Sequence, residues 1–396
     1  MAATTLEDLK EKLMNQSKGS IVSILGSDEN EEWLSSPARD LNRILSGSLY
    51  SSVQVGNHIA IIGPEAVGKS SFMALMLADA QKKGYIPVVI DAEGAWKPPF
   101  VTRWGLSPDN MIRIKSLWIE DIMVELTKFI ENGFTNLAIA FDSIGALESK
   151  KMIRDGTKKD DVKSDQGRLQ KDIKRMLKML VSIAKFNNSI VFSAGHYYGN
   201  PTGYGDPEKI GGGFYYRLSA DTMITLKKSP IYEFPNAEKK AEKGKILGTS
   251  ITAATLKNRL YPPFQEASVE IDFQKGVNEN AGLVKVAMDI GLLERNGSWY
   301  KCDTLELKIQ GEANFYNKLN SMDITPLLDK IEEFLKTTGY SSVNRKLELQ
   351  EEEKEEIKEE EIKEVEKEEV KSNNSKNLNS KKSTIAKMTS TKKSKT

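Results

Sequence analysis

The stretch IAIIGPEAVGKSSF at residues 59–72 constrains the fold of this chain more than any other feature. An apolar run at residues 59–62 predicts a buried strand, and the motif G-x-x-x-x-G-K-S follows it at residues 63–70. The next residues, FMALMLADAQKK, are rich in helix formers. A strand, a glycine-rich turn and a helix in this order are typical of a phosphate-binding loop, because glycine lets successive N–H groups curl inward onto phosphate oxygens at the helix N-terminus. The sequence therefore predicts a site for a nucleoside triphosphate.

Two residues of this motif carry most of its chemistry. Lys69 would place its ammonium on the β- and γ-phosphates, and the hydroxyl of Ser70 would ligate Mg²⁺. The residues expected around the phosphates are Gly63, Pro64, Glu65, Ala66, Val67, Gly68, Lys69, Ser70 and Ser71.

Length and composition limit the class of protein. The 396 residues are enough for one large α/β domain and a smaller unit. Cys302 is the only cysteine, so no intrachain disulfide can form, which fits a reducing cytoplasm. No apolar run reaches the length of a membrane span, and the N-terminus lacks a signal-peptide pattern. We therefore expect a cytoplasmic protein that does not enter a membrane.

Residues 35–276 have the pattern of an α/β domain. Short apolar runs predict strands, and helical patterns near residues 69–83, 116–132 and 166–186 separate the first four of them. The predicted strands are residues 59–63, 87–91, 137–142, 189–195, 221–228, 251–258 and 268–273. Nearly continuous apolar strands with helical crossovers indicate a mostly parallel central sheet covered on both faces. Ligands of such sheets bind at the carboxyl ends of the strands.

Polar residues at these strand ends are the catalytic candidates. Asp91 and Glu93 follow the second strand, and Glu93 is chosen as the carboxylate that polarises a water for attack on a γ-phosphate. Asp142 ends the third strand, where it would hold Mg²⁺. His196 follows the fourth strand and either bonds the γ-phosphate or is structural. His58 precedes the first strand and is expected to be structural.

Two further segments point to nucleic acid. Residues 150–178 contain 11 Lys or Arg and 5 Asp, which is either an ordinary solvated helix face or a basic surface for phosphates. The segment HYYGNPTGYGDPEKIGGG combines glycines with tyrosines and Lys209, a mixture that suits the backbone and bases of a single strand. The candidate DNA-binding residues are Lys158, Lys159, Lys163, Arg168, Tyr197, Tyr198, Lys209, Gly211 and Gly212.

The two ends of the chain differ from this domain. Residues 1–34 contain a helical pattern at 6–16 and the apolar run GSIVSILG, which either dock on their own core or reach a neighbouring subunit by strand addition. Residues 351–371 hold 12 Glu and 5 Lys, and the rest of the chain holds 7 Lys and no acid. We predict that residues 346–396 form a disordered tail, which either keeps the protein soluble or regulates access to DNA.

Five motifs in order resemble one family. They are GPEAVGKSS, IDAEG, AFDSIGAL, the run from SAGHYYGN through GGGFYYRLSAD, and LKNRLYPPF. Together they resemble RecA-type homologous recombinases, and most closely the phage UvsX-like branch. The similarity extends from about residue 18 to residue 301. It implies a RecA-like P-loop NTPase core at residues 35–276, an N-terminal assembly element at 1–34 and a small C-terminal α/β lobe at 277–345.

The resemblance also implies roles for individual residues. In the family, ATP with Mg²⁺ is held between adjacent subunits of a helical filament on DNA. Lys257 and Arg259 match the basic pair that reaches a neighbour's γ-phosphate, in the manner of arginine fingers. Phe100 would stack on adenine, and His196 falls where RecA has glutamine and UvsX-like proteins have histidine. The segments near 156–167 and 197–212 match the two DNA loops.

Three features depart from the family pattern. Lys97 replaces an acidic residue that in RecA lies near the adenine. The tail ends in a Lys-rich stretch, whereas the family usually ends in acidic residues. The segment from about 282 to 340 matches the family's C-terminal lobe only loosely.

The function expected from the sequence is that of a DNA-dependent ATPase. It would form filaments on single-stranded DNA and exchange strands with a homologous duplex, with a single-strand binding protein and a loading mediator as further partners. The UvsX-like pattern suggests a phage protein in the cytoplasm of a bacterial host. One alternative is a hexameric RecA-fold motor or helicase, and another is a coat protein that binds ATP as a structural ligand without hydrolysing it.

Overall fold

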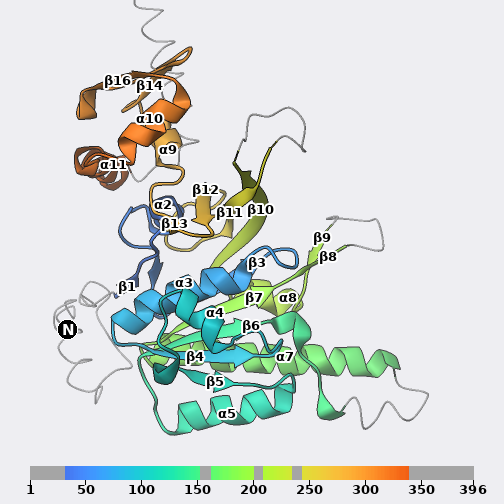
Figure 1. The fold of residues 1–396 in the computed structure, drawn as a ribbon. Helices are drawn as coiled ribbons and strands as arrows, with labels where there is room; N and C mark the ends of the chain where they lie inside the picture. The colour runs from blue at the N-terminus through green and yellow to red at the C-terminus, as the bar shows by residue number, and fades with distance from the viewer. Residues whose placement is uncertain (1–31, 152–161, 200–207, 234–242, 339–396) are drawn as a thin grey trace, which may run out of the picture. The chain divides into compact units, whose positions relative to one another are not determined.

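The computed structural model describes residues 32–151, 162–199, 208–233 and 243–338. Its largest element is a nine-stranded sheet (Figure 1). In spatial order the strands are β13 (Gly276–Asn278), β12 (Glu266–Asp272), β11 (Ile246–Lys257), β10 (Thr222–Tyr232), β3 (His58–Ile62), β7 (Ile190–Gly195), β6 (Leu137–Asp142), β4 (Ile86–Asp91) and β5 (Ile112–Ile114). The strands from β10 to β5 pair in parallel, whereas β11, β12 and β13 extend the sheet in antiparallel fashion. The predicted mostly parallel α/β core is confirmed.

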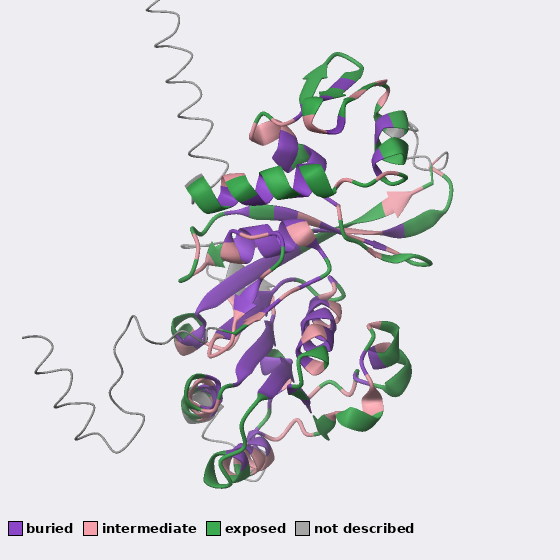
Figure 2. Ribbon diagram, turned by 90° about the vertical axis from the view of Figure 1, so that its left-hand side faces the viewer, coloured by how far each residue is buried: buried purple, intermediate pink, exposed green. Residues whose placement is uncertain are grey.

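The central strands are apolar along their whole length because helices cover both faces. Every residue of β3, β6 and β7 is buried, and Figure 2 shows these strands in the buried interior. In β3, Ile59 and Ile61 pack with the helix α3 (Lys69–Lys82) on one face. Ala60 and Ile62 point to the other face, which is covered by α5 (Ile119–Glu131) and α7 (Val162–Phe186).

The predicted elements agree closely with the structure, and the misses have simple causes. β5 was not predicted, since it has only three residues and includes the charged Arg113. β10 and β11 were predicted too short, because they continue as an antiparallel ribbon, edged by β12, beyond the point where β10 leaves β3 at Thr225 (Figure 1). Residues of that ribbon are largely exposed, so the apolar signal fades at Lys227 and Lys228.

Shorter elements complete the core. The glycine-rich segment after β7 was predicted to be a loop, but its two ends pair as a hairpin of β8 (Tyr197–Gly199) and β9 (Glu208–Ile210). The remaining elements of the core are β1 (Trp33–Leu34), α2 (Arg39–Ser46), β2 (Val53–Gln54), α4 (Pro98–Arg103), η1 (Pro108–Asn110), η2 (Ile144–Ala146) and α8 (Phe214–Ser219). The predicted N-terminal helix lies outside the described residues, and so does the whole of the predicted tail.

A small C-terminal lobe follows β13. It contains α9 (Leu283–Asp289), a three-stranded sheet of β14 (Glu294–Asn296), β15 (Trp299–Cys302) and β16 (Leu307–Gln310), then η4 (Asp303–Leu305), α10 (Glu312–Leu319) and α11 (Thr325–Thr338). Its own apolar cluster is centred on Tyr300 and Phe315, whose rings stack at 4.9 Å. Leu49 from the core inserts into this cluster, and Glu332 of α11 accepts a 2.7 Å hydrogen bond from the Leu49 amide.

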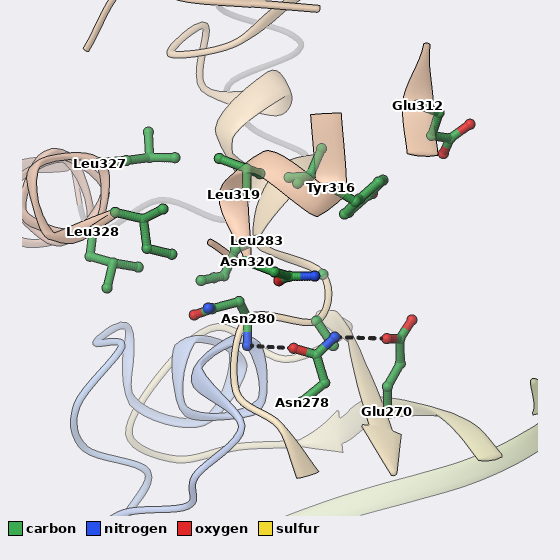
Figure 3. A pocket seen from close by; sticks show the side chains of 14 residues that line it. Glu270, Asn278, Asn280, Leu283, Glu312, Tyr316, Leu319, Asn320, Leu327 and Leu328 are labelled. Carbon is green, nitrogen blue, oxygen red and sulfur yellow. Dashed lines mark hydrogen bonds between the residues drawn. The ribbon is translucent and has the colours of Figure 1, made fainter. Parts of the chain in front are cut away.

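A cavity of about 430 Å³ lies where this lobe meets the β12–β13 edge (Figure 3). Leucines from α9, α10 and α11 line it together with polar side chains such as Asn278 and Glu270, which are joined by a 2.9 Å hydrogen bond. None of its lining residues belongs to the glycine-rich loop at residues 63–68. In the part of the chain that the structure describes, no helix is long and apolar enough to cross a membrane.

Candidate nucleotide-binding site

The loop between β3 and α3 has the backbone that phosphate binding requires. Ala66 and Gly68 adopt positive φ angles of 56° and 108°. A Cβ on Gly63 would come within 2.8 Å of Val67 Cγ1 and 3.0 Å of the Leu226 carbonyl oxygen, so only glycine fits there. The loop leads directly into the first residue of α3, which places a helix N-terminus at its end. This shape fits the phosphates of a nucleotide.

Lys69 lies inside this loop. Its ammonium donates hydrogen bonds to the carbonyl oxygens of Gly63 at 3.1 Å and Pro64 at 2.8 Å. Burial lowers the pKa of the Lys69 ammonium, and the nearby carboxylates of Asp142 and Glu93 act in the opposite direction. The ammonium therefore stands where phosphate oxygens could replace the two loop carbonyls.

Ser70 and Asp142 are brought together, as their predicted Mg²⁺ role requires. The Ser70 hydroxyl donates to Asp142 Oδ2 at 2.6 Å, and the indole N–H of Trp96 donates to the same oxygen at 2.8 Å. Burial raises the pKa of the Asp142 carboxyl, although these two hydrogen bonds oppose the shift. Two hard oxygen donors fit Mg²⁺, which takes few protein ligands and completes its shell with water and phosphate oxygens. Among the described residues no group of three or more His, Cys, Asp or Glu could hold a metal by itself.

Glu93 and His196 complete the cluster around Lys69. His196 Nδ1 lies 3.3 Å from the Lys69 ammonium, and its Nε2 lies 3.5 Å from Glu93 Oε1. An ammonium can only donate, so Nδ1 accepts and the ring proton of a neutral His196 sits on Nε2, facing Glu93. The Ser143 hydroxyl also donates to Glu93. Residues from the ends of β4, β6 and β7 thus converge on the loop after β3.

The structure separates the two acids that follow β4. Asp91 is buried and accepts the backbone N–H groups of Gly94, Ala95 and Trp96 at 2.7–3.1 Å. It also pairs with the guanidinium of Arg113. Asp91 therefore stabilises the loop that carries Glu93. The side chain of Glu93 makes none of these bonds and faces Lys69 and His196.

Phe100 lies on α4 near this cluster. It is partly buried against the core, and its ring meets that of Trp96 edge-on at 5.3 Å. Stacking of Phe100 on adenine remains a prediction.

Lys257 and Arg259 lie away from the loop of their own subunit. Lys257 donates to the carbonyl oxygens of Arg217 at 3.1 Å and Ala220 at the end of α8. Arg259 bonds Asp221 Oδ1 at 2.7 Å. The backbone N–H of Asp221 in turn bonds the carbonyl of His58, at the start of β3. The basic pair therefore lies at the end of the sheet opposite to the glycine-rich loop.

The predicted DNA-binding residues are only partly described. Lys158 and Lys159 lie outside the described residues, as do the side chains of Lys163, Tyr198 and Lys209. Arg168 is exposed on α7, and Tyr197 is partly buried against the core.

Gly211 contributes a backbone hydrogen bond to the site, and Gly212 has a structural reason to be glycine. The Gly211 N–H bonds the His196 carbonyl at 2.9 Å. Gly212 has a φ of 89°, and a Cβ there would come within 3.2 Å of Ile144 and Tyr216. The Gly211 bond thus ties the second predicted DNA loop to the residue that follows β7.

Two residues of the site were missed by the sequence analysis. Trp96 lies three residues after Glu93, close to a predicted strand-end carboxylate, and this position is a signal that could have found it. Ser143, which the sequence places with Asp142 at the end of the third predicted strand, bonds Glu93. Lys228 of β10 donates to the carbonyl of Ala66, and no feature of the sequence indicates this contact. His58, by contrast, is structural as expected: it is buried and bonded to the Ser193 hydroxyl at 2.7 Å.

Comparison with known proteins identifies the family of this chain. The model of the RecA N-terminal domain family matches residues 4–278. The RecA protein of Rickettsia canadensis is 26% identical over 330 residues, which cover 81% of this chain and 91% of that protein. The RecA protein of Rhizobium leguminosarum is 27% identical over 304 residues, or 75% of this chain and 81% of that protein. The corresponding protein of Cereibacter sphaeroides is 26% identical over 290 residues, or 72% and 79%.

These relatives give no support to the helicase alternative. The matched segment contains the loop, the strand-end cluster and the distant basic pair. The chain therefore belongs to the RecA family and is a RecA-type recombinase with a DNA-dependent ATPase activity.

Proposed function

We propose that this chain works as a helical filament in which ATP and Mg²⁺ are bound between adjacent subunits. The observation that carries this proposal is the position of Lys257 and Arg259, which lie at the far end of the sheet from the Lys69 loop. If Lys257 and Arg259 are to reach a phosphate, it must therefore be one that is held by the loop of another subunit. A head-to-tail contact of this kind builds an open helical filament when the rotation between subunits does not close a ring.

The residues of the site suggest how hydrolysis proceeds. On nucleotide binding, the Lys69 ammonium exchanges the carbonyls of Gly63 and Pro64 for phosphate oxygens. Mg²⁺, held by Ser70 and Asp142, would neutralise charge on the phosphates. Glu93 accepts the proton of the attacking water, and His196, which lies between Glu93 and Lys69, responds to loss of the γ-phosphate.

DNA binding is proposed for the two segments at residues 156–167 and 197–212. The partners are single-stranded DNA and a homologous duplex, with a single-strand binding protein and a loading mediator assisting assembly. Gly211 is bonded to the carbonyl of His196, which supports coupling between the nucleotide site and the second segment. Loss of the γ-phosphate would then weaken both DNA binding and the contact between subunits.

We also assign the chain to the UvsX-like branch, acting in the cytoplasm of a phage-infected bacterium. His196, whose Nδ1 lies 3.3 Å from the Lys69 ammonium, supports this assignment, because UvsX-like proteins have histidine at this position. In the proposed organisation, residues 1–34 dock on the next subunit, 277–345 form the C-terminal lobe and 346–396 form the charged tail.

Electron microscopy with ATP and single-stranded DNA tests the filament. Open helices that form with the wild-type protein and are lost with Lys69→Ala are the expected result. Closed rings of fixed subunit number would contradict it. DNA affinity should also fall steeply with added salt, since the proposed loops act on phosphates.

A further inference from the structure

Lys228 connects the ribbon of β10 and β11 to the phosphate-binding loop. Its ammonium donates a hydrogen bond to the carbonyl oxygen of Ala66, the loop residue with a φ of 56°. A left-handed backbone at a residue other than glycine is unfavourable and persists only where the surroundings hold it.

The sheet register explains why Lys228 reaches the loop. Side chains alternate between the two faces of a strand, so Lys228 shares its face with Ile224 and Leu226. Ile224 and Leu226 both pack in the same apolar cluster as α3, the helix that begins at the loop. Lys227 has the same charge and is also exposed, but it points to the opposite face.

The loop itself rests on this part of the sheet. Leu226 contributes the carbonyl oxygen that would meet a Cβ on Gly63, and Ile251, which is opposite Lys228 in β11, would meet a Cβ on Gly68. Gly63 and Gly68 thus sit against the strands at both ends of the loop. Ala66 lies between them and is exposed.

Two lysines donate hydrogen bonds to carbonyl oxygens of this loop. Nucleotide binding affects the hydrogen bonds of the two lysines differently. Lys69 bonds the carbonyls of Gly63 and Pro64 from within the loop and must release them to bind phosphate. Lys228 bonds Ala66 from the neighbouring strand. Loop N–H groups that turn inward leave their carbonyls outward, so the Lys228 contact can persist when phosphate is bound.

We propose that Lys228 is a positioning residue that keeps the phosphate-binding loop in its binding conformation before nucleotide arrives. Because the loop is already ordered before binding, less conformational entropy is lost when nucleotide binds, and the affinity for nucleotide increases. Lys228 acts through the Ala66 carbonyl, so it strengthens binding of di- and triphosphates alike and leaves the chemical step unchanged. This inference rests on the proposed nucleotide site.

The test compares Lys228→Met with Lys227→Met in the full chain without DNA. Both variants remove one exposed positive charge from the same strand and keep a long side chain. Calorimetric titration with ADP and with AMP-PNP, each with Mg²⁺, measures the dissociation constants. Lys228→Met should raise both constants by about five- to tenfold, the size expected for loss of one solvent-exposed hydrogen bond. Lys228→Arg, which keeps a donor, should restore most of the affinity, and Lys227→Met should bind as the wild type does.

A second measurement needs no nucleotide. Hydrogen exchange of the amides at residues 64–70 should be faster in Lys228→Met than in the wild type or Lys227→Met, with the rest of the core unchanged. Unchanged binding and exchange in Lys228→Met would overturn the proposal. Equal losses in the two methionine variants would indicate general electrostatic attraction, and a loss confined to AMP-PNP would indicate direct contact with the γ-phosphate; either would overturn it too.

A different result would show that the proposed nucleotide site itself is wrong. That result is either a wild-type protein that binds neither nucleotide, or a Lys69→Ala variant whose dissociation constants for both nucleotides equal those of the wild type. The exchange rates of the nucleotide-free loop would still decide whether Lys228 holds it.

Discussion

Lys257 and Lys69 lie at opposite ends of the same sheet. Lys257 bonds the carbonyl of Ala220, next to Asp221, whose N–H bonds the carbonyl of His58 at the start of β3. Lys69 follows the loop at the other end of that strand. The five residue-to-residue steps from His58 to Gly63 span about 16 Å at the usual rise of a strand, beyond the reach of a lysine side chain. The two ammonium groups cannot serve one phosphate group within a single subunit.

Mixing two inactive variants should therefore restore ATPase activity. Lys69→Ala lacks the phosphate-binding lysine, and the double variant Lys257→Ala/Arg259→Ala lacks the distant pair. In a random 1:1 filament, about a quarter of the interfaces combine an intact loop from one subunit with an intact pair from the next. DNA-stimulated turnover of the mixture should approach that fraction of the wild-type rate. No recovery in mixtures that form filaments would mean that the pair does not act across the interface.

Glu93→Gln should abolish turnover while nucleotide binding persists. The amide keeps the shape of the side chain and can still meet the Ser143 hydroxyl, but it cannot accept the proton of the attacking water. Loss of a general base typically lowers kcat by about 10²- to 10⁴-fold. Steady-state ATPase measurements and calorimetric binding separate the two effects.

Asp91→Asn is the matched control for that carboxylate. Asp91 is fully engaged with three backbone N–H groups and Arg113, so its loss should lower thermal stability as well as activity. Glu93→Gln should leave the melting temperature close to that of the wild type. Equal falls in stability would mean that Glu93 also has a structural role.

Ser70→Ala should raise the Mg²⁺ concentration needed for half-maximal ATPase activity by roughly tenfold, because a hydroxyl ligand is removed. The same change leaves Asp142 with Trp96 as its hydrogen-bond donor among the side chains of this cluster. Ser70→Thr keeps the hydroxyl and should behave as the wild type does. An unchanged Mg²⁺ requirement in Ser70→Ala would remove Ser70 from the metal site.

The sequence predicted most of the fold and the centre of the site because their signals are local. Strands such as LAIAFD and the motif ending in Lys69 and Ser70 depend on neighbours in the sequence. The convergence of Glu93, Asp142 and His196 followed from one rule, that parallel strands end at the same edge. Contacts between strands distant in sequence were not predictable. The bond from Lys228 to Ala66 spans 162 residues and depends on the parallel register of β10 and β3.

The distinction between Asp91 and Glu93 needed the structure for a similar reason. Both are acids at the end of one strand, and the choice of Glu93 rested on its place in the pattern. Their difference comes from a turn of backbone that points three N–H groups at Asp91, and from an arginine on β5, a strand that the sequence did not reveal. Short edge strands carry weak periodic signals, so partners on them are missed.

His58 predicts a specific loss of stability in acid. Burial lowers the pKa of the folded-state His58 to about 4, against 6.5 for the exposed side chain. Between these values the unfolded chain binds a proton that the folded chain does not, so the free energy of unfolding falls as the pH falls from 6.5 to 4. A difference of this size corresponds to roughly 3 kcal/mol, with no contribution above pH 7.

The matched variant is His58→Gln, whose amide can still bond the Ser193 hydroxyl without titrating. Urea unfolding at several pH values would give the free energy for each protein. The wild type should lose about 3 kcal/mol more than His58→Gln between pH 7 and pH 4, while carboxylates contribute equally to both. Parallel curves would show that His58 titrates normally in the folded protein, and hence that it is not enclosed between β3 and β7 in solution.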